Sequence, residues 1–211
     1  NKMIGLFLGD TDFSEIVLSK IKKQKKKYFI IDFSKNNKFN KDKNSFRISI
    51  GKFGTIIDLI KQKKCKRVLF AGKISKPNFS SLRLDFKGIY YMPSVIRAAK
   101  LGDAAIIKSI IKILSKEGIR VISSIFFNPE LSLKKGNYSK IKPNNKDLIN
   151  IKKGIRILQK SNSLDHVQAA IVNENKIMKE TKNGTKKLIQ SINKNLIQEG
   201  ILIKYPKKKQ D

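Results

Sequence analysis

The first apolar run of the sequence is Met3-Ile4-Gly5-Leu6-Phe7-Leu8, and it is closed by Asp10 and Asp12. This run is too short for a membrane-spanning helix, which needs roughly 18 to 20 apolar residues. A short, continuous apolar run of this kind predicts a buried β-strand. Glu15 stands three positions after Asp12, ahead of an apolar stripe at helical spacing, and this pattern predicts a helix capped by Asp12. A strand followed directly by a helix is the beginning of a β-α-β unit.

The same alternation of strands and helices continues through the first half of the chain. We expect further strands at 28–32, 46–50, 68–71 and 120–123, a helix that starts at 51–54, and a helix from Asp103 to a stop signal at Gly118. This order is typical of an α/β fold with a Rossmann-like, mostly parallel sheet covered by helices on both faces. In such sheets, ligands bind at the carboxyl ends of the strands.

The second half of the chain follows a polar segment. Residues 128–145 contain two prolines and one glycine without a sustained hydrophobic period, and they predict an interdomain linker. Beyond it, Asn144 and Asp147 mark the start of a helix, and we expect strands at 169–172, 177–180 and 201–205 and a helix at 186–198. The predicted organisation is an N-terminal domain over 1–127 and a smaller α/β (α+β) domain over 146–211.

The composition bounds the class of protein. No window is apolar enough to span a membrane, and neither a signal-peptide core nor a cleavage site is recognisable, so we expect a cytoplasmic protein. Cys65 is the only cysteine, which excludes a disulfide framework and a cysteine zinc site within one chain. The formal net charge is +31, yet only six of the 47 basic residues are arginine. This charge fits either a solvated lysine surface or a polyanionic partner.

Seven segments, read in order, carry a family resemblance. They are Gly51-Lys52-Phe53-Gly54-Thr55-Ile56-Ile57, Phe70-Ala71-Gly72-Lys73-Ile74-Ser75-Lys76-Pro77, Leu82-Arg83-Leu84-Asp85, Gly102-Asp103-Ala104-Ala105, Leu164-Asp165-His166-Val167-Gln168-Ala169-Ala170-Ile171-Val172, Gly184-Thr185, and Lys204-Tyr205-Pro206-Lys207-Lys208-Lys209-Gln210-Asp211. In this order and spacing, the sequence resembles the UDP-2,3-diacylglucosamine pyrophosphatases of lipid A biosynthesis, in the form that lacks a metallophosphatase motif. The resemblance covers nearly the whole chain.

The resemblance implies a reaction and its participants. The reaction is hydrolysis of the pyrophosphate of UDP-2,3-diacylglucosamine to UMP and 2,3-diacylglucosamine 1-phosphate, with Mg²⁺ as the ion and with two domains that enclose the lipid-linked UDP-sugar. Members of the family continue for a further segment after the motif that ends here at Asp211, so we expect part of the second domain to be missing. A lysine-rich surface would be attracted to the anionic inner membrane, and a homo-oligomer is compatible with the sequence.

Candidate substrate-binding residues in the first half lie at the ends of predicted elements. After the strand at 68–71, a glycine allows close backbone approach and lysines can meet phosphate, although a solvated loop is the alternative. The first strand-to-helix turn suits a nucleotide but does not match G-x-G-x-x-G, and for both aspartates in the set the alternative is a role as a helix cap. The candidates are Gly9, Asp12, Gly72, Lys73, Lys76 and Asp103.

The second half supplies the candidate acids. Splitting a pyrophosphate requires charge neutralisation and a positioned water, which lysines and carboxylates that hold Mg²⁺ can provide. Asp211 follows a lysine-rich loop, although a terminal acid without a role is the alternative, and Asp165 and Gln168 could equally be turn and edge residues. The candidates are Asp211 as the catalytic carboxylate, Asp211, Asp165 and Glu180 as magnesium ligands, and Gln168, Gly184, Thr185, Lys204 and Lys207 as substrate contacts.

Departures from the family pattern concern charge. Asn183 and Lys186 stand where relatives carry carboxylates, and activity would fall if either lost acid holds Mg²⁺. His166 is the only histidine and replaces an apolar position, which favours a packing or surface role.

The competing interpretation is a non-catalytic binder of nucleotide or RNA that kept the fold. Nucleic acid is the less favoured partner, because the sequence lacks an aromatic RNA-binding signature and its aromatic fraction is 8%.

Overall fold

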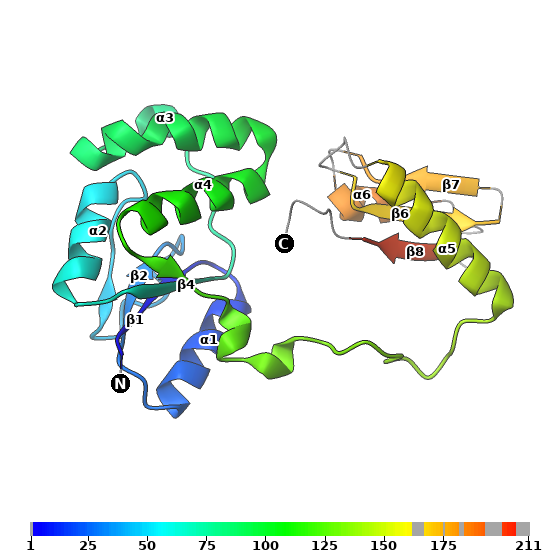
Figure 1. The fold of residues 1–211 in the computed structure, drawn as a ribbon, viewed down its shortest axis with the longest axis horizontal. Helices are drawn as coiled ribbons and strands as arrows, with labels where there is room; N and C mark the ends of the chain where they lie inside the picture. The colour runs from blue at the N-terminus through cyan, green and yellow to red at the C-terminus, as the bar shows by residue number, and fades with distance from the viewer. Residues whose placement is uncertain (1, 162–166, 175, 182–183, 193–199, 206–211) are drawn as a thin grey trace. The chain divides into compact units, whose positions relative to one another are not determined.

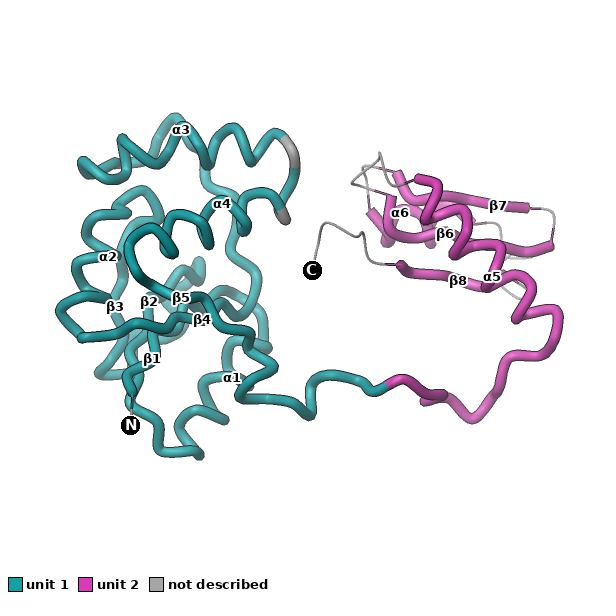
Figure 2. Tube along the Cα trace, viewed as in Figure 1, with its two compact units in different colours: residues 1–134 teal, residues 135–211 magenta. Residues whose placement is uncertain are grey.

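The computed structural model describes residues 2–161, 167–174, 176–181, 184–192 and 200–205. The chain forms two compact units, unit 1 over Asn1–Lys134 and unit 2 over Lys135–Asp211 (Figure 2). A short 3-10 helix, η3, covers Pro129–Leu131, and residues 132–144 form neither helix nor strand. None of the described helices is long and apolar enough to cross a membrane.

Unit 1 is built on a five-stranded parallel sheet (Figure 1). The predicted α/β fold with a parallel sheet is therefore confirmed. The chain leaves β1 toward β2 and later crosses to β4 on the other side of β1, so the carboxyl ends of β1 and β4 form the switch point at which such sheets bind ligands. The strands, in the order β3-β2-β1-β4-β5, are β1 (Ile4–Leu8), β2 (Tyr28–Asp32), β3 (Ser45–Phe46), β4 (Arg67–Ala71) and β5 (Arg120–Val121).

Helices cover both faces of this sheet. Phe7 of β1 packs in one core with Ile57 of α2 and Leu114 of α4, whereas Leu6 packs in the other core with Val17 of α1. Neighbouring residues of β1 thus face opposite cores, which explains why this strand is apolar throughout. The α-helices of the described part of unit 1 are α1 (Asp12–Lys23), α2 (Phe53–Gln62), α3 (Phe86–Leu101) and α4 (Asp103–Lys116).

Some elements of unit 1 differ from the sequence prediction. The strand expected at 46–50 ends at Phe46, and the strand expected at 120–123 ends at Val121. The sequence prediction lacks α3 altogether, because Gly88 and Pro93 interrupt its helical pattern. This helix packs along α4, so tertiary contacts stabilise a segment of poor intrinsic helical propensity.

The predicted capping roles of Asp12 and Asp103 are wrong. Thr11 precedes α1 and Gly102 precedes α4, and neither helix has a side-chain cap. Each aspartate instead occupies the first helical position, where a carboxylate still interacts favourably with the helix dipole. Gly118, with φ +75°, does end α4 as predicted.

Unit 2 packs helices on both faces of a three-stranded antiparallel sheet, in agreement with the smaller α/β domain that was expected. Asn144 and Asp147 form the predicted start of the first helix, since each side chain accepts the backbone N–H of the other at 2.9 Å. The helix expected at 186–198 begins two residues earlier, at Gly184. The elements are α5 (Asn145–Lys160), β6 (Ala169–Asn173), β7 (Lys176–Lys179), α6 (Gly184–Gln190) and β8 (Ile201–Lys204), with strand order β7-β6-β8.

Glu117 connects three helices of unit 1. Its carboxylate accepts hydrogen bonds from Lys61 Nζ at 2.8 Å, from Lys87 Nζ at 2.7 Å and from the Tyr91 hydroxyl at 3.0 Å. The bonds from the two lysines are the main reason that the pKa of Glu117 is lowered to about 2. The side chain of Glu117 is only 12% exposed, so its carboxylate is largely shielded from solvent.

We expect Glu117→Gln to lower the free energy of unfolding of unit 1 at neutral pH, because the two ion pairs with Lys61 and Lys87 are lost. The decrease should be only about 1 to 2 kcal/mol, because solvent screens the half-exposed lysines. The folded pKa of Glu117 lies below its ordinary value of 4.5, so the stabilisation is complete above that value and is lost as the pH falls toward about 2. Denaturant unfolding of both proteins across this range measures the effect. The two unfolding free energies should converge in acid, and a constant difference would contradict the prediction.

Candidate functional site

The carboxyl ends of β1 and β4 bring Gly9, Gly72 and Lys73 together. The Gly9 N–H donates to the Ala71 carbonyl at 2.9 Å, and a Cβ on Gly9 would lie 2.3 Å from the Lys73 carbonyl oxygen. Gly72 has φ +83°, and a Cβ there would lie 2.1 Å from Ser14 Oγ. Only glycine fits at these two positions, because the turn after β1 packs closely against the turn after β4. The exposed Lys73 is the side chain that this turn offers to an anion.

The other candidates of unit 1 are one residue of the same strand-to-helix turn, Asp12, and two residues farther along the chain, Lys76 and Asp103. The side chain of Asp12 is 94% exposed and lies 3.8 Å from Lys38 Nζ. Lys76 Nζ donates to the carbonyl of Ala99, in the last turn of α3, at 3.2 Å. Asp103 begins α4 directly after that helix. The structure thus places Lys76 beside the turn from α3 to α4, where Asp103 also lies.

Sequence reasoning misses Asp85, which joins two of the resembling segments. Its carboxylate accepts hydrogen bonds from the N–H groups of Gly54 at 3.0 Å, Thr55 at 2.9 Å and Gly88 at 2.8 Å, at the starts of α2 and α3. Burial opposes ionisation, yet these N–H groups outweigh it and lower the pKa of Asp85 below its ordinary value. An aspartate three residues before Gly88 is a capping signal that could have revealed α3.

Asp32, at the carboxyl end of β2, is fully buried. Its Oδ1 accepts hydrogen bonds from the N–H of Ser34 at 2.8 Å and from its hydroxyl at 2.6 Å, and its Oδ2 accepts the N–H of Phe39 at 3.2 Å. In dinucleotide-binding sheets, an acid near this position contacts a ribose. Here both carboxylate oxygens hold the loop that follows β2, so Asp32 serves the fold.

Glu180 gathers the predicted residues of unit 2. It follows β7 and is 8% exposed. Its Oε2 accepts the N–H of Gln168 at 2.9 Å, and its Oε1 accepts the hydroxyl of Thr185 at 2.7 Å. Gln168 immediately precedes β6, whereas Thr185 lies in the first turn of α6. Three segments that are separate in the sequence therefore converge on one carboxylate.

Two further candidates lie at the same end of this sheet. Lys204 ends β8, is exposed, and pairs with Ala169 at the start of β6. Gly184 has φ +81° and begins the helix that carries Thr185. We call Gln168, Glu180, Gly184, Thr185 and Lys204 the Glu180 cluster. The remaining candidates, Asp165, Lys207 and Asp211, lie outside the described residues, as do His166 and Asn183.

The described residues do not form a metal cage by themselves. No group of three His, Cys, Asp or Glu side chains that could hold an ion occurs within the described ranges. Glu180 is the only predicted magnesium ligand in those ranges, and each of its oxygens already accepts a hydrogen bond. Mg²⁺ in enzymes is often bound through one or two carboxylates together with waters and substrate phosphates. Glu180 can therefore supply only part of such a site.

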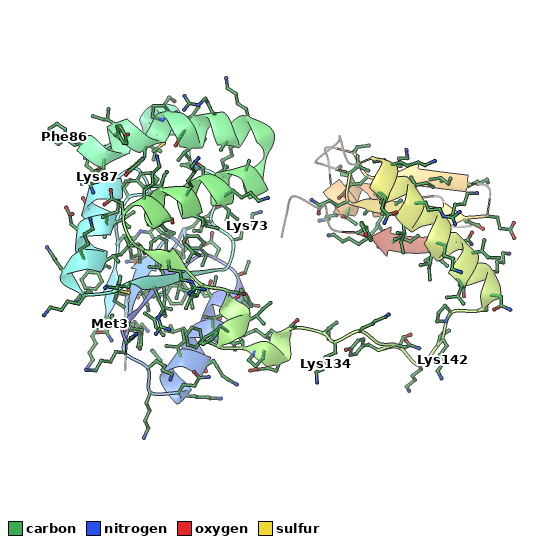
Figure 3. The ribbon with its side chains drawn as sticks, viewed as in Figure 1. Met3, Lys73, Phe86, Lys87, Lys134 and Lys142 are labelled. Atoms are coloured by element: carbon green, nitrogen blue, oxygen red, sulfur yellow. The ribbon has the colours of Figure 1, made fainter. Side chains whose placement is uncertain are left out.

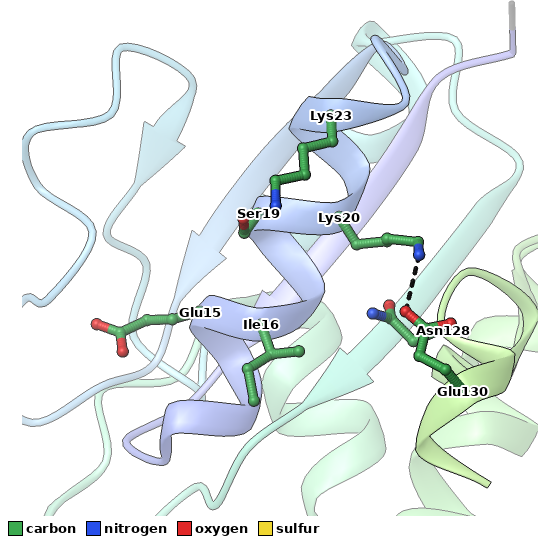
Figure 4. A pocket seen from close by; sticks show the side chains of 7 residues that line it. All are labelled: Glu15, Ile16, Ser19, Lys20, Lys23, Asn128 and Glu130. Carbon is green, nitrogen blue, oxygen red and sulfur yellow. Dashed lines mark hydrogen bonds and ion pairs between the residues drawn. The ribbon is translucent and has the colours of Figure 1, made fainter.

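A surface groove of about 430 Å³ lies on α1, and none of the described residues that line it is a candidate (Figure 4). Lys20 Nζ lies 2.7 Å from Glu130 Oε1 at its rim. Two acids and two lysines line this groove, so its charge is balanced and it offers no focus for a diphosphate. Its lining consists of Glu15, Ile16, Ser19, Lys20, Lys23, Asn128 and Glu130.

Comparisons with known proteins bear on both units. The LpxI N-terminal domain matches residues 3–131, and the LpxI C-terminal domain matches residues 134–211. The UDP-2,3-diacylglucosamine pyrophosphatase LpxI of Caulobacter vibrioides is 30% identical over 146 residues, which are 69% of this chain and 52% of that relative. The chain thus spans about half the length of the curated relative that it matches. Because its two halves match the two domains of one family in order and almost end to end, this chain belongs to the LpxI family.

Proposed function

We propose that this chain hydrolyses the pyrophosphate bond of UDP-2,3-diacylglucosamine and releases UMP and 2,3-diacylglucosamine 1-phosphate. The observation that carries the proposal is the Glu180 cluster, in which residues from separate family-like segments meet at one buried carboxylate. The name of the Caulobacter relative, a UDP-2,3-diacylglucosamine pyrophosphatase, supports the same reaction.

In this proposal the Glu180 cluster binds the substrate and Asp211 is the catalytic carboxylate. Diphosphate hydrolysis requires positive charge near the non-bridging oxygens and a water in line with the leaving group. Lys204 supplies an ammonium group at the end of β8, and Glu180 orients Gln168 and Thr185 through its two hydrogen bonds. Further proposed substrate contacts are Lys207 and, in unit 1, Gly9, Asp12, Gly72, Lys73, Lys76 and Asp103.

We also propose that Mg²⁺ accompanies the substrate. Asp165, Glu180 and Asp211 are its proposed ligands, and Glu180 is the one whose surroundings are described. When bound, the ion would neutralise negative charge on the diphosphate.

The native chain should release UMP from the diacylated UDP-sugar, presented in detergent micelles, only when Mg²⁺ is present. Chelation with EDTA should reduce the rate to background, and excess Mg²⁺ should restore it, because the ion offsets the charge of the diphosphate. Chromatographic quantification of UMP measures the rate. Release that continues unchanged in EDTA would contradict the magnesium requirement, whereas no release under any condition would contradict the reaction.

A second candidate function is non-catalytic binding of a nucleotide or RNA. It is favoured by the net charge of +31 and by Asn183 and Lys186, which the family resemblance places where carboxylates are expected. Tight RNA binding with a steep salt dependence, together with no hydrolysis, would support this function over the first.

A further inference from the structure

The helices α3 and α4 present cations and aromatic rings on one side of unit 1. The residues on α3 are separated by four and seven positions, and those on α4 by four, so each set forms a row along its helix. We call this surface the α3–α4 face. It consists of Phe86, Tyr90 and Arg97 on α3 and Lys108, Lys112 and Lys116 on α4.

A groove of about 540 Å³ between the two helices joins these rows. The helices lie side by side along their lengths (Figure 1). Tyr90 and Arg97 line the groove from α3, the three lysines line it from α4, and Ser94 and Ser109 complete the polar part of its lining. Among the described residues that line it, none is an aspartate or a glutamate. The groove therefore offers positive charge to an anionic partner.

The charge of this face is not neutralised within the described chain. Lys61 and Lys87, which lie nearby in the same helical layer, both pair with Glu117. Among the residues that the structure describes, none forms an ion pair with Arg97 or with the three lysines of α4. Four cations around one groove repel one another, and an anionic partner would relieve that repulsion.

The same face carries exposed apolar surface. Phe86 is 93% exposed and Tyr90 is 74% exposed, and Ile89 between them is 62% exposed. Figure 3 shows Phe86 at the beginning of α3, next to Lys87. From Phe86 to Arg97 the helix axis extends about 17 Å, which is long enough for the row to lie along a surface. Exposed rings combined with lysine and arginine are typical of helices that lie at a lipid–water boundary.

We propose that the α3–α4 face docks on a bilayer that contains anionic phospholipids. Its cations bind headgroup phosphates, and Phe86 and Tyr90 enter the boundary between headgroups and acyl chains. RNA is less suited, because rings on a helix do not form the flat platform of a sheet on which bases stack. The inference deepens the proposed function and rests on it, since a chain that acts on a lipid-linked substrate meets that substrate at a membrane.

Vesicle flotation tests the charged part of this face. The native chain should bind vesicles made of equal parts phosphatidylglycerol and phosphatidylcholine, and not vesicles of phosphatidylcholine alone. Each cation near an anionic surface contributes roughly fivefold, so Arg97→Gln/Lys108→Gln/Lys112→Gln should weaken binding on the order of a hundredfold. The matched control is Lys27→Gln/Lys43→Gln/Lys66→Gln, which removes the same charge from exposed lysines that precede β2, β3 and β4. It should weaken binding less than about tenfold.

The apolar part has its own test. Phe86→Ser should weaken binding to the anionic vesicles about tenfold, because a ring inserted among the lipids is lost. Phe126→Ser is the control, since Phe126 is also an exposed phenylalanine of unit 1, at 70%. The control should bind as the native chain does.

Three outcomes would overturn the docking proposal. The two charge variants could weaken binding equally, soluble poly(U) could bind the same residues more tightly than the vesicles do, or Phe86→Ser could dissociate a dimer seen by sedimentation.

UMP release in detergent micelles separates this proposal from the proposed function. Both charge variants should retain that activity, whereas absence of UMP release in the native chain would count against the enzyme and leave the vesicle result standing.

Discussion

Replacing Glu180 with glutamine is expected to slow UMP release at least about a hundredfold while the chain stays folded. The carboxylate accepts one hydrogen bond from Gln168 and one from Thr185. A glutamine has a single acceptor oxygen, so its NH₂ group must face one of these donors. The substitution also removes the negative charge. We expect the unfolding free energy of unit 2 to fall by about 1 to 3 kcal/mol, because a buried bond to a charged group is lost.

Glu174→Gln is the matched control within unit 2. Glu174 is exposed and pairs with Lys146 at 2.7 Å, so its loss changes the net charge equally at a solvated position. UMP release should stay within about twofold of the native rate, since a surface ion pair contributes little to the stability of the fold. Asp211→Ala, in the same assay, should abolish release. If Glu180→Gln were no slower than Glu174→Gln, the Glu180 cluster would not be part of the active site.

Gly9→Ala is expected to destabilise unit 1 by about 3 kcal/mol or more, because the new methyl group meets the backbone. Its Cβ would lie 2.3 Å from the Lys73 carbonyl oxygen and 2.6 Å from the Lys73 carbonyl carbon. Neither atom can rotate away as a side chain could. The two turns would have to separate, which would also strain the bond from the Gly9 N–H to the Ala71 carbonyl. Calorimetry should show a melting temperature lower by about 10 °C.

Gly136→Ala is the comparison for this substitution. A Cβ on Gly136 would meet only Tyr138 Cε2, at 3.8 Å, which is an ordinary contact. The unfolding free energy should therefore change by no more than about 0.5 kcal/mol. Hydrogen exchange can locate the effect of Gly9→Ala, which should increase exchange in β1 and β4 and leave unit 2 unchanged. Equal stability of the two variants would show that the turns do not pack as closely as the structure indicates.

Much of the fold could be predicted because it depends on residues that are close in the chain. The apolar run of β1, the stop at Gly118 and the pair Asn144 and Asp147 are local signals, and each corresponds to the expected element. The prediction failed at α3, where a local capping signal was missed and packing overrides poor helical propensity. α3 contains Gly88 and Pro93, yet it is a helix because Asp85 caps it and α4 packs along it.

The sequence alone determined the order of strands and helices apart from α3, the parallel sheet, the smaller second unit and the family. Only the tertiary structure decided which carboxylates serve the fold and which could serve a substrate. Asp85 accepts the Gly54 N–H across 31 positions, and Glu180 accepts the Gln168 N–H across 12. Such partners are chosen by how distant elements pack, and a partly or fully buried carboxylate needs them because it has lost contacts with water.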